Sequence, residues 1–278
     1  LFAYKSLAPD SATPQIGEIN GVKVRRVLQL IKDFARGPMD ALRVFDFGCA
    51  EGVYAIETAL RGARVHAFDA RMERMEQGRA IAARLGLDNL TFEQADIRTV
   101  DATSHGEADI VLMLGLLYHL GSNDLFDVLK TIRALCHQFV IIETWVALEA
   151  RDHIEYEGET YTGTLVREHH DNDSVAVRTG RLLASIDNSH SFRPTRESLL
   201  RALQACGYTS VCECALPAYP GMPEDRVTLI ACTGSPVRLS SYPWLNDLDE
   251  ASIAERLEAY AALLRARWTG ADSPGTKR

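Results

Sequence analysis

Residues 43–52 read Arg-Val-Phe-Asp-Phe-Gly-Cys-Ala-Glu-Gly. The first half predicts a buried strand, the small residues that follow predict a tight turn, and the apolar spacing of residues 53–60 predicts a helix. Gly48 permits the turn, and Ala50 and Gly52 are small enough for a ligand to lie against the main chain. A strand that turns through glycines into a helix directs backbone N–H groups toward the carboxyl edge of a sheet. This stretch therefore indicates a ligand-binding turn in an α/β fold.

Strands and helices alternate after this turn. Further strands are expected at residues 64–68, 90–94, 109–114 and 139–143, and further helices at 71–85 and 125–136. An earlier helix, with apolar residues at helical spacing from Val24 to Phe34, ends before Gly37. Strands that alternate with helices of this length predict βαβ units on a parallel sheet that is buried on both faces.

The alternation fails after Trp145. Residues 148–192 are rich in Gly, Asp, Asn and His and contain only short β-like pieces. A structureless loop of this length is unusual in a compact domain, so we expect an inserted lid with its own hairpins. Regular structure then resumes, with a helix and a terminal antiparallel hairpin expected at residues 194–205, 209–215 and 226–233.

The last segment of the chain predicts an amphipathic helix. Ser252 and Glu255 form a capping box at its start. Its apolar stripe consists of Ile253, Leu257, Tyr260, Leu264 and Trp268. Such a stripe packs either on its own domain or against a second copy of the chain, so a homodimer is one expected assembly.

Composition argues against several classes of protein. The 278 residues carry 30 Lys and Arg against 38 Asp and Glu, a formal net charge of −8, which disfavours a nucleic-acid partner. The most continuous apolar stretch, Ile110–Tyr118, is far shorter than the roughly 18 residues of a membrane-spanning helix, so no membrane span is expected. No signal peptide is expected, and the six cysteines predict reduced thiols in a cytoplasmic protein.

Acidic residues stand at the ends of the first three strands. Asp46 lies inside the turn motif, and Asp69, 23 residues later, ends the second strand. A carboxylate at the second position can accept hydrogen bonds from both hydroxyls of a ribose. Asp96 follows the third strand, where it can accept a hydrogen bond from the exocyclic amine of an adenine. Its alternative role is to cap a helix or turn.

Together these residues resemble the class I S-adenosylmethionine-dependent methyltransferases. The resemblance covers residues 24–146 closely and 191–233 in outline, and Ala50 departs from it because many members have Gly at that position. It implies a doubly wound, Rossmann-like α/β fold whose seven-stranded sheet has six parallel strands and one antiparallel strand. It also implies S-adenosylmethionine as cofactor and S-adenosylhomocysteine as product.

The resemblance implies a role for each motif. The Asp46-x-Gly48-x-x-x-Gly52 motif supports the methionine part of the cofactor, Asp69 binds the ribose, and Asp96 reads the adenine. The end of the fourth strand, at Leu114 and Gly115, lines the methyl-donor pocket. The expected cofactor-binding residues are Asp46, Gly48, Cys49, Ala50, Gly52, Asp69, Ala70, Asp96, Ile97, Leu114 and Gly115.

Tyr118 and His119 follow the fourth strand and are the candidate catalytic residues. His119 can take a proton from the methyl acceptor, because an imidazole with the ordinary pKa of about 6.5 is partly neutral near pH 7. Packing of the aromatic pair is the alternative. Glu143 and Trp145 end the fifth strand and line either the same cavity or the core. Residues 168–171, Glu-His-His-Asp, are interpreted as a solvated lid face, and no metal is expected.

Residues 114–120 and 191–198 are further similar to the branch that includes the tRNA wobble-uridine carboxymethyltransferases. The acidic balance of the chain favours a small-molecule substrate over RNA. We therefore expect a methyltransferase that acts on an O, N or S atom of a small metabolite. The alternatives are a non-methylating isomerase or cyclase on the same fold, a tRNA-modifying enzyme, and a non-catalytic binding module.

The expected division of the chain follows from these roles. Residues 1–40 form an N-terminal helical flank and residues 41–147 form the cofactor-binding half of the core. The remaining segments are the inserted substrate lid (148–192), the C-terminal part of the core sheet (193–235) and the C-terminal amphipathic helix with its tail (236–278).

Overall fold

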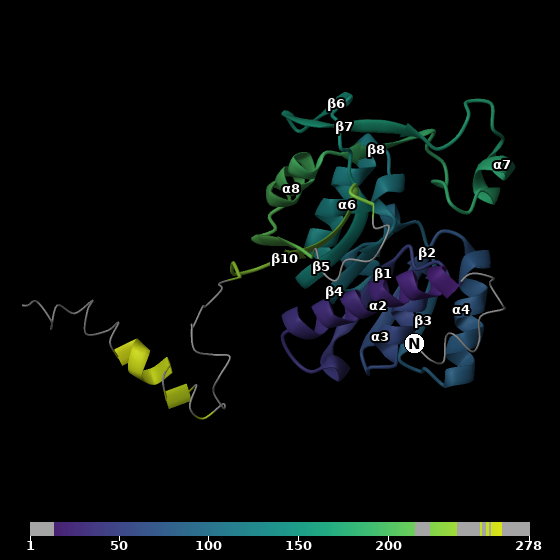
Figure 1. The fold of residues 1–278 in the computed structure, drawn as a ribbon. Coiled ribbons are helices and arrows are strands. Elements are labelled where there is room, and N and C mark those ends of the chain that lie inside the picture. The colour runs from purple at the N-terminus through teal and green to yellow at the C-terminus, as the bar shows by residue number, and fades with distance from the viewer. Residues whose placement is uncertain (1–13, 215–222, 238–250, 252–253, 256, 263–278) are drawn as a thin grey trace, which may run out of the picture. The chain divides into compact units, whose positions relative to one another are not determined.

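The computed structural model describes residues 14–214, 223–237, 251, 254–255 and 257–262 (Figure 1). The chain divides into two units, residues 1–237 and residues 238–278. In the second unit the described residues, which include Leu257 and Tyr260, are helical. Four positions of the predicted capping box and stripe lie outside the described residues: Ser252, Ile253, Leu264 and Trp268.

The first unit holds all of the elements discussed below. In chain order they are α2 (Pro14–Phe34), η1 (Met39–Ala41), β1 (Arg43–Phe47), α3 (Val53–Ala59), β2 (Arg64–Asp69), α4 (Met72–Leu85), β3 (Leu90–Gln94), η2 (Ile97–Thr99), α5 (Ala102–His105), β4 (Ala108–Leu114), η3 (Leu117–His119), α6 (Ser122–Leu135), β5 (Cys136–Trp145), β6 (Asp152–Tyr156), β7 (Glu159–Arg167), α7 (Val175–Gly180), β8 (His190–Pro194), α8 (Arg196–Ala205), β9 (Ser210–Glu213) and β10 (Arg226–Cys232). None of the helices in the described part of the chain has the length and apolar character needed to cross a membrane.

Seven strands form one sheet in the order β3-β2-β1-β4-β5-β10-β9. Strands β1 to β5 pair in parallel, and β10 pairs antiparallel with both β5 and β9. Six strands therefore share one direction and β10 opposes them, which confirms the predicted sheet. The chain order reverses between β1 and β4, and α/β sheets bind ligands beyond the carboxyl ends of the strands at such a point.

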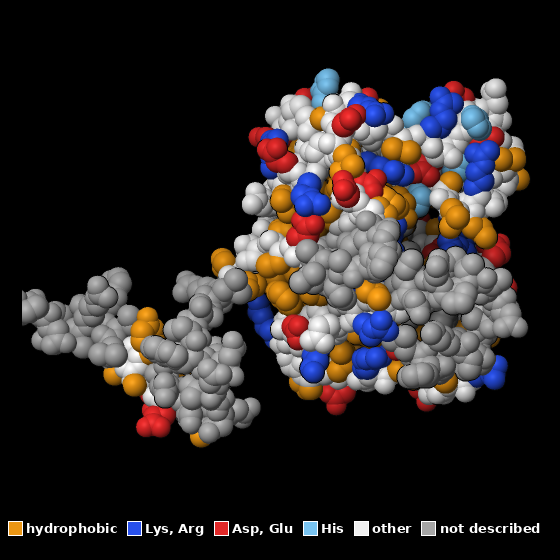
Figure 2. Space-filling model, viewed as in Figure 1, with side chains coloured by type: hydrophobic (Ala, Val, Ile, Leu, Met, Phe, Trp, Pro, Cys, Tyr) orange, Lys and Arg blue, Asp and Glu red, His pale blue; other side chains and the backbone are white. Residues whose placement is uncertain are grey.

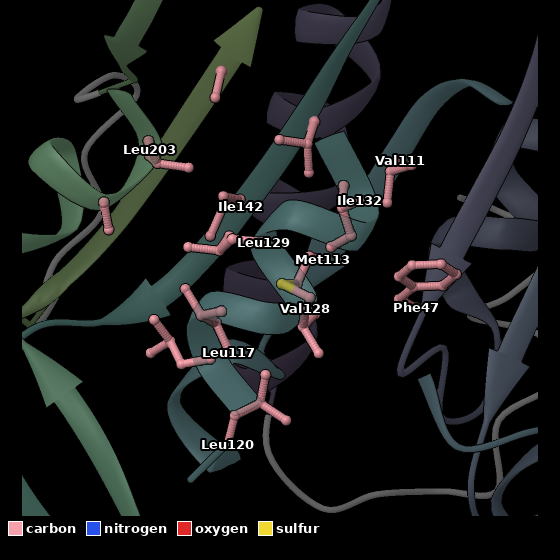
Figure 3. Packing of buried hydrophobic residues seen from close by; sticks show 14 of the residues in the cluster. Phe47, Val111, Met113, Leu117, Leu120, Val128, Leu129, Ile132, Ile142 and Leu203 are labelled. Atoms are coloured by element: carbon pink, nitrogen blue, oxygen red, sulfur yellow. The ribbon is translucent and has the colours of Figure 1, made fainter. Parts of the chain in front are cut away.

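The strands bury side chains on both faces of the sheet. Ile110 and Leu112 of β4 pack in a core with α2, α3 and α4, whereas Val111 and Met113 pack in a second core with α6 and α8. Figure 1 shows these two helical layers on opposite sides of the sheet. Figure 3 shows the second core, where α6 side chains pack against β4 and β5, with labels on Val128, Leu129, Ile132, Val111, Met113 and Ile142. Burial on both faces confirms the reading of apolar, parallel strands.

The segment after β5 contains a smaller antiparallel sheet in the order β6-β7-β8. Tyr161 of β7 and Phe192 of β8 are buried in the same core as α6 and α8. Gly163 of β7 permits the close pairing with β8, since a Cβ at that position would collide with the Arg193 carbonyl oxygen. The inserted strands are therefore joined to the main core, and β8 runs to Pro194, past the boundary expected at residue 192.

Candidate active site

A cavity of about 460 Å³ lies at the carboxyl ends of the first parallel strands. Pockets of this size hold small molecules and cofactors. The expected site residues that line it are Gly48, Ala50, Asp69, Ala70, Asp96, Ile97, Leu114, Gly115, Tyr118 and His119. Asp46, Cys49 and Gly52 do not line it, although they belong to the same turn. Glu143 lines the cavity, whereas Trp145 packs edge-on against Tyr118 outside it.

The turn between β1 and α3 uses left-handed backbone at three positions. The φ angles are 71° at Gly48, 50° at Ala50 and 75° at Gly52. A Cβ on Gly48 would lie 2.9 Å from the Leu116 side chain, and a Cβ on Gly52 would lie 2.5 Å from the Phe92 ring. Gly48 and Gly52 therefore allow the turn to pack against Leu116 and against β3, and Gly48 and Ala50 are the turn residues that line the cavity.

Asp69 is held by main-chain groups on both of its carboxylate oxygens. Oδ2 accepts the N–H of Ala50 and Oδ1 accepts the N–H of Arg71, each at 2.9 Å. An ionised carboxylate has about two acceptor positions on each oxygen, so each oxygen of Asp69, which lines the cavity, retains one. Two neighbouring acceptors of this kind suit the vicinal hydroxyls of a ribose.

Asp46 lies behind the cavity wall and is 2% exposed. Burial and then the charge of Asp69 raise the pKa of Asp46 to about 7, while a backbone hydrogen bond at Ala55 lowers it. Its Oδ2 has no hydrogen-bond partner within the described part of the chain. Asp46 thus interacts with the site electrostatically, through repulsion from the Asp69 carboxylate. A cation in the cavity would favour the ionised form of Asp46.

The Asp96 carboxylate is bound by an arginine of the following turn. Arg98 donates to both oxygens of Asp96 and also to Asp124 at 3.0 Å and Asp187 at 2.7 Å. Burial raises the pKa of Asp96, but the hydrogen bonds from Arg98 outweigh it, and the net shift is downward. Asp96 also accepts the Arg98 N–H and caps η2, so the predicted cap exists alongside a place in the cavity wall.

Arg71, which precedes α4, and Arg74, in the first turn of α4, connect the cavity to the insertion. The Arg71 guanidinium donates to four backbone carbonyls between residues 179 and 185, each at 3.1 Å. Arg74 donates to the Leu182 carbonyl at 2.9 Å. Residues 182–188 line the same cavity as a result. The part of the insertion that follows α7 is therefore a wall of the site.

A second group of lining residues surrounds Glu143 of β5. Its Oε1 lies 3.1 Å from Nζ of Lys23 and 2.8 Å from Nε of Arg226. Burial raises the pKa of Glu143, but the charges and hydrogen bonds of Arg226 and Lys23 lower it by more, so the net shift is downward. Arg226 also lies over the rings of Tyr118, at 5.7 Å, and Trp145, at 5.0 Å. These contacts hold Tyr118 at the cavity wall.

His119 ends the short turn η3 and contacts the insertion. Its Nδ1 lies 3.1 Å from both carboxylate oxygens of Glu168, whose side chain is only 6% exposed. Glu168 also accepts the N–H of Ser185 at 3.0 Å and the hydroxyl of Ser191 at 2.8 Å. A buried carboxylate with this many donors is arranged to stay ionised.

The structure divides the Glu-His-His-Asp motif of residues 168–171 between two environments. His169 is 1% exposed, and its Nε2 lies 2.8 Å from the Ser185 carbonyl oxygen. His170 and Asp171 are exposed. The interpretation of the motif as a solvated face is therefore wrong for Glu168 and His169. Across residues 14–214 and 223–237, and in the described helical residues beyond them, no cluster of three or more His, Cys, Asp or Glu side chains could hold a metal ion.

Several lining residues were not foreseen from the sequence. Arg71 and Arg98 each stand two residues after an expected site acid, so position alone offered a usable signal for them. Lys23 and Arg226 offered none, because they come from a helix before the motif and from β10. Glu168 does not line the cavity and reaches the site through its contact with His119. Only folding brings these side chains to the carboxyl edge of the sheet.

Two comparisons with known sequences agree with this site. Residues 44–138 match the family described as "Methyltransferase domain". The chain is also 24% identical over 146 residues to the ubiquinone biosynthesis O-methyltransferase of Leptothrix cholodnii, a match that covers 52% of this chain and 57% of that protein. The aligned part thus spans little more than half the length of this curated relative.

Solved structures share the fold. The N-terminal domain of EvdMO1 with SAH bound superposes with a TM-score of 0.61 at 19% identity and covers 76% of this chain and 81% of that chain. Magnesium protoporphyrin IX methyltransferase from Synechocystis PCC 6803 with bound SAM has a TM-score of 0.53 at 16% identity and covers 84% of this chain and 90% of that chain. At these identities the likeness establishes the architecture of the sheet and its helices.

The family match and the cavity involve the same part of the chain. The match runs from β1 into β5 and includes the glycine turn, Asp69, Asp96 and η3. The order of the large sheet, with β10 as its antiparallel strand, is the order expected from the resemblance. Residues 44–138 therefore form a methyltransferase domain, set in the sheet architecture that the resemblance to the class I S-adenosylmethionine-dependent methyltransferases implied.

Proposed function

We propose that this chain transfers a methyl group from S-adenosylmethionine to a small molecule bound beside it. One observation carries the proposal: a single cavity of about 460 Å³ is lined both by the glycine turn with Asp69 and by Tyr118 and His119. The first group suits a nucleoside cofactor, and the second supplies polar groups for an acceptor. Methyl transfer requires both in one enclosure, because the reaction depends on positioning the two reactants.

The cavity residues fit the cofactor. Gly48 and Ala50 of the turn line the cavity, and Asp69 offers two acceptor positions for ribose hydroxyls. When bound, S-adenosylmethionine supplies an electrophilic methyl group on a positively charged sulfur. The raised pKa of Asp46 reports burial and repulsion from Asp69, and a cation bound nearby would relieve that repulsion.

The insertion supports a small acceptor. Residues 182–188 form part of the cavity wall, so we propose that residues 148–192 act as the substrate lid. Figure 2 shows basic and acidic side chains interspersed over the described part of the face in view, which gives a polyanion such as RNA little to bind. The named relatives include an O-methyltransferase of ubiquinone biosynthesis, and EvdMO1 was crystallised in the presence of SAH and D-fucose.

The chain's own groups would perform three tasks in this reaction. Leu114, Leu116 and Leu120 give the cavity an apolar wall that excludes water. Tyr118, held by Arg226, would orient the acceptor. His119 would accept a proton from an acceptor that has one to lose.

The proposal is tested by binding and transfer measured on the same protein. Calorimetry with S-adenosylhomocysteine reports the cofactor site, and transfer of a labelled methyl group is measured with a panel of phenols, sugars, carboxylic acids, amines and thiols. A parallel reaction contains bulk tRNA. We expect micromolar-range cofactor binding, and label in at least one class of small molecule.

Two outcomes would contradict the proposal. Label that enters tRNA alone would assign the chain to RNA modification. The second outcome is tight cofactor binding without methyl transfer to any acceptor, while a compound of the panel is converted to a product of the same mass. That result would indicate an isomerase or cyclase on the same fold.

A further inference from the structure

The contact between His119 and Glu168 joins two parts of the chain that are 49 residues apart. His119 lines the cavity, and Glu168 follows β7 in the insertion. Glu168 is fixed in turn by Ser185 and Ser191, which belong to two later parts of the insertion. Three separate pieces of the insertion therefore converge behind one cavity side chain.

The protonation of Glu168 determines which ring nitrogen of His119 carries hydrogen. Burial raises the pKa of Glu168, but the hydrogen bonds from His119, the Ser185 N–H and the Ser191 hydroxyl outweigh it, and the net shift is downward. An ionised carboxylate can only accept hydrogen bonds. In the neutral ring Nδ1 must therefore carry the proton that faces Glu168, and Nε2 presents its lone pair.

We propose that Glu168 is a positioning residue that holds His119 in the Nδ1–H form, so that Nε2 removes the proton of a hydroxyl acceptor. The proposal rests on the proposed function and narrows its substrate class to alcohols and phenols. The acceptor oxygen gives its proton to Nε2 and forms a bond to the methyl carbon, and the electrons of the broken carbon–sulfur bond remain on sulfur. The acquired proton stays on an imidazolium that the Glu168 carboxylate stabilises.

The other charged groups near η3 make contacts with residues other than His119, although the buried Nε of Arg193 has no hydrogen-bond partner in the described part of the chain. The centroid of the Tyr118 ring lies 4.3 Å from that of the His119 ring. The guanidinium groups of Arg193 of β8 and Arg226 of β10 both lie 5.7 Å from the centroid of the Tyr118 ring. Glu143 of β5 is paired with Lys23 and Arg226. Glu168 is thus the carboxylate that contacts His119 directly, and removal of its charge should act mainly on the protonation of the His119 imidazole.

The first readout does not depend on activity. Nitrogen-15 NMR of the histidine rings in the cofactor-free protein should show His119 as the Nδ1–H tautomer in the wild type. In Glu168→Gln, which is close to isosteric but uncharged, the tautomer preference should weaken and the ring should titrate at lower pH, because the imidazolium has lost its anionic partner. An unchanged tautomer and titration midpoint would overturn the proposal.

The second readout is the pH profile of transfer to a hydroxyl acceptor. We expect Glu168→Gln to lower kcat about 10²-fold and His119→Asn about 10²–10⁴-fold, both with cofactor affinity within about threefold of wild type. The acidic limb of the kcat profile, which rises as His119 loses its proton, should move to lower pH in Glu168→Gln. Glu168→Asp keeps the charge and should recover part of kcat and of the wild-type profile.

A matched control separates the effect of position from that of charge. Glu149→Gln makes the same exchange near the start of the insertion, where the side chain is 74% exposed, and should leave kcat and its pH profile unchanged. If the wild type transfers methyl groups but Glu168→Gln and His119→Asn do so at the wild-type rate, the positioning role is wrong and the proposed function stands. If the wild type transfers no methyl group, the proposed function fails, and the NMR experiment still tests the His119–Glu168 contact.

Discussion

The carboxyl edge of the large sheet and the insertion after β5 contribute to one cavity by different physical means. At the sheet edge, Asp69 is fixed by two backbone N–H groups, one of them only two residues away in sequence. The insertion is held by long side chains, as when Arg71 donates to carbonyls more than 100 residues distant. Short main-chain contacts give a rigid site, whereas side-chain contacts to a segment with little regular structure can open locally at lower cost.

The insertion itself contains two kinds of structure. Strands β7 and β8 place Tyr161 and Phe192 in the main hydrophobic core, so this part is as firmly packed as the sheet. The segment that follows α7 is bound to Arg71 and Arg74 through its backbone carbonyls and has exposed Leu182 and Leu183 side chains, at 49% and 82% exposure. The difference indicates a rigid base that carries an openable wall, and the following predictions test that division.

The largest effect should come from the base of the insertion. Phe192→Ala should lower the free energy of unfolding by about 3–5 kcal/mol, because it removes a fully buried aromatic ring from the core. Leu165→Ala is the matched control, since Leu165 pairs with Phe192 across β7 and β8 but is 41% exposed. Urea unfolding monitored by circular dichroism measures both, and a loss below about 1 kcal/mol for Phe192→Ala would mean that the base is a detachable lid.

The next effect should fall on the rigid site at the sheet edge. Asp69→Ala should weaken binding of S-adenosylhomocysteine by roughly 1.5–3 kcal/mol, about 10–150-fold, because the ribose hydroxyls lose a charged acceptor. Calorimetry measures the change, with exposed Asp88→Ala as the control that should bind normally. Unchanged affinity in Asp69→Ala would remove the ribose role.

A smaller and more local effect is expected from the arginine that holds the openable wall. Arg71→Ala should increase amide hydrogen exchange of residues 179–185 by about 10-fold while the protection of β1 and β4 is retained, since only side-chain bonds to the wall are lost. Arg79→Ala, which changes an exposed arginine of α4, should alter neither region. Equal loss of protection in the sheet would show that wall and sheet open as one unit.

The smallest effect should come from the strained position of the turn. Ala50→Gly should raise the free energy of unfolding by no more than about 1 kcal/mol, because relief of the left-handed conformation is partly offset by greater freedom of glycine in the unfolded chain. Cofactor affinity should stay within about twofold, since the Ala50 N–H bond to Asp69 does not need the side chain. Thermal unfolding and calorimetry test both statements, and a tenfold change in affinity would show that the methyl group contacts the ligand.

The sequence predicted most of the sheet because its signals are local. The strand, glycine turn and helix of residues 43–60 obey short-range rules of burial and backbone conformation, and the structure places β1 and α3 there. The same signals placed Asp69 and Asp96 at strand ends, where both line the cavity. They overestimated Gly52, because periodicity cannot show that a Phe92 ring from another strand fills the space beside it.

The amino-acid sequence by itself determined the fold class, the position of the cofactor turn and the acids around it, since each depends on residues close together in the chain. Tertiary structure alone decided that Glu168 meets His119, that Arg71 holds residues 179–185, and that Lys23 and Arg226 share Glu143. The physical reason is that such contacts depend on how separate elements pack in space, and no short pattern of residue types encodes the distance between them.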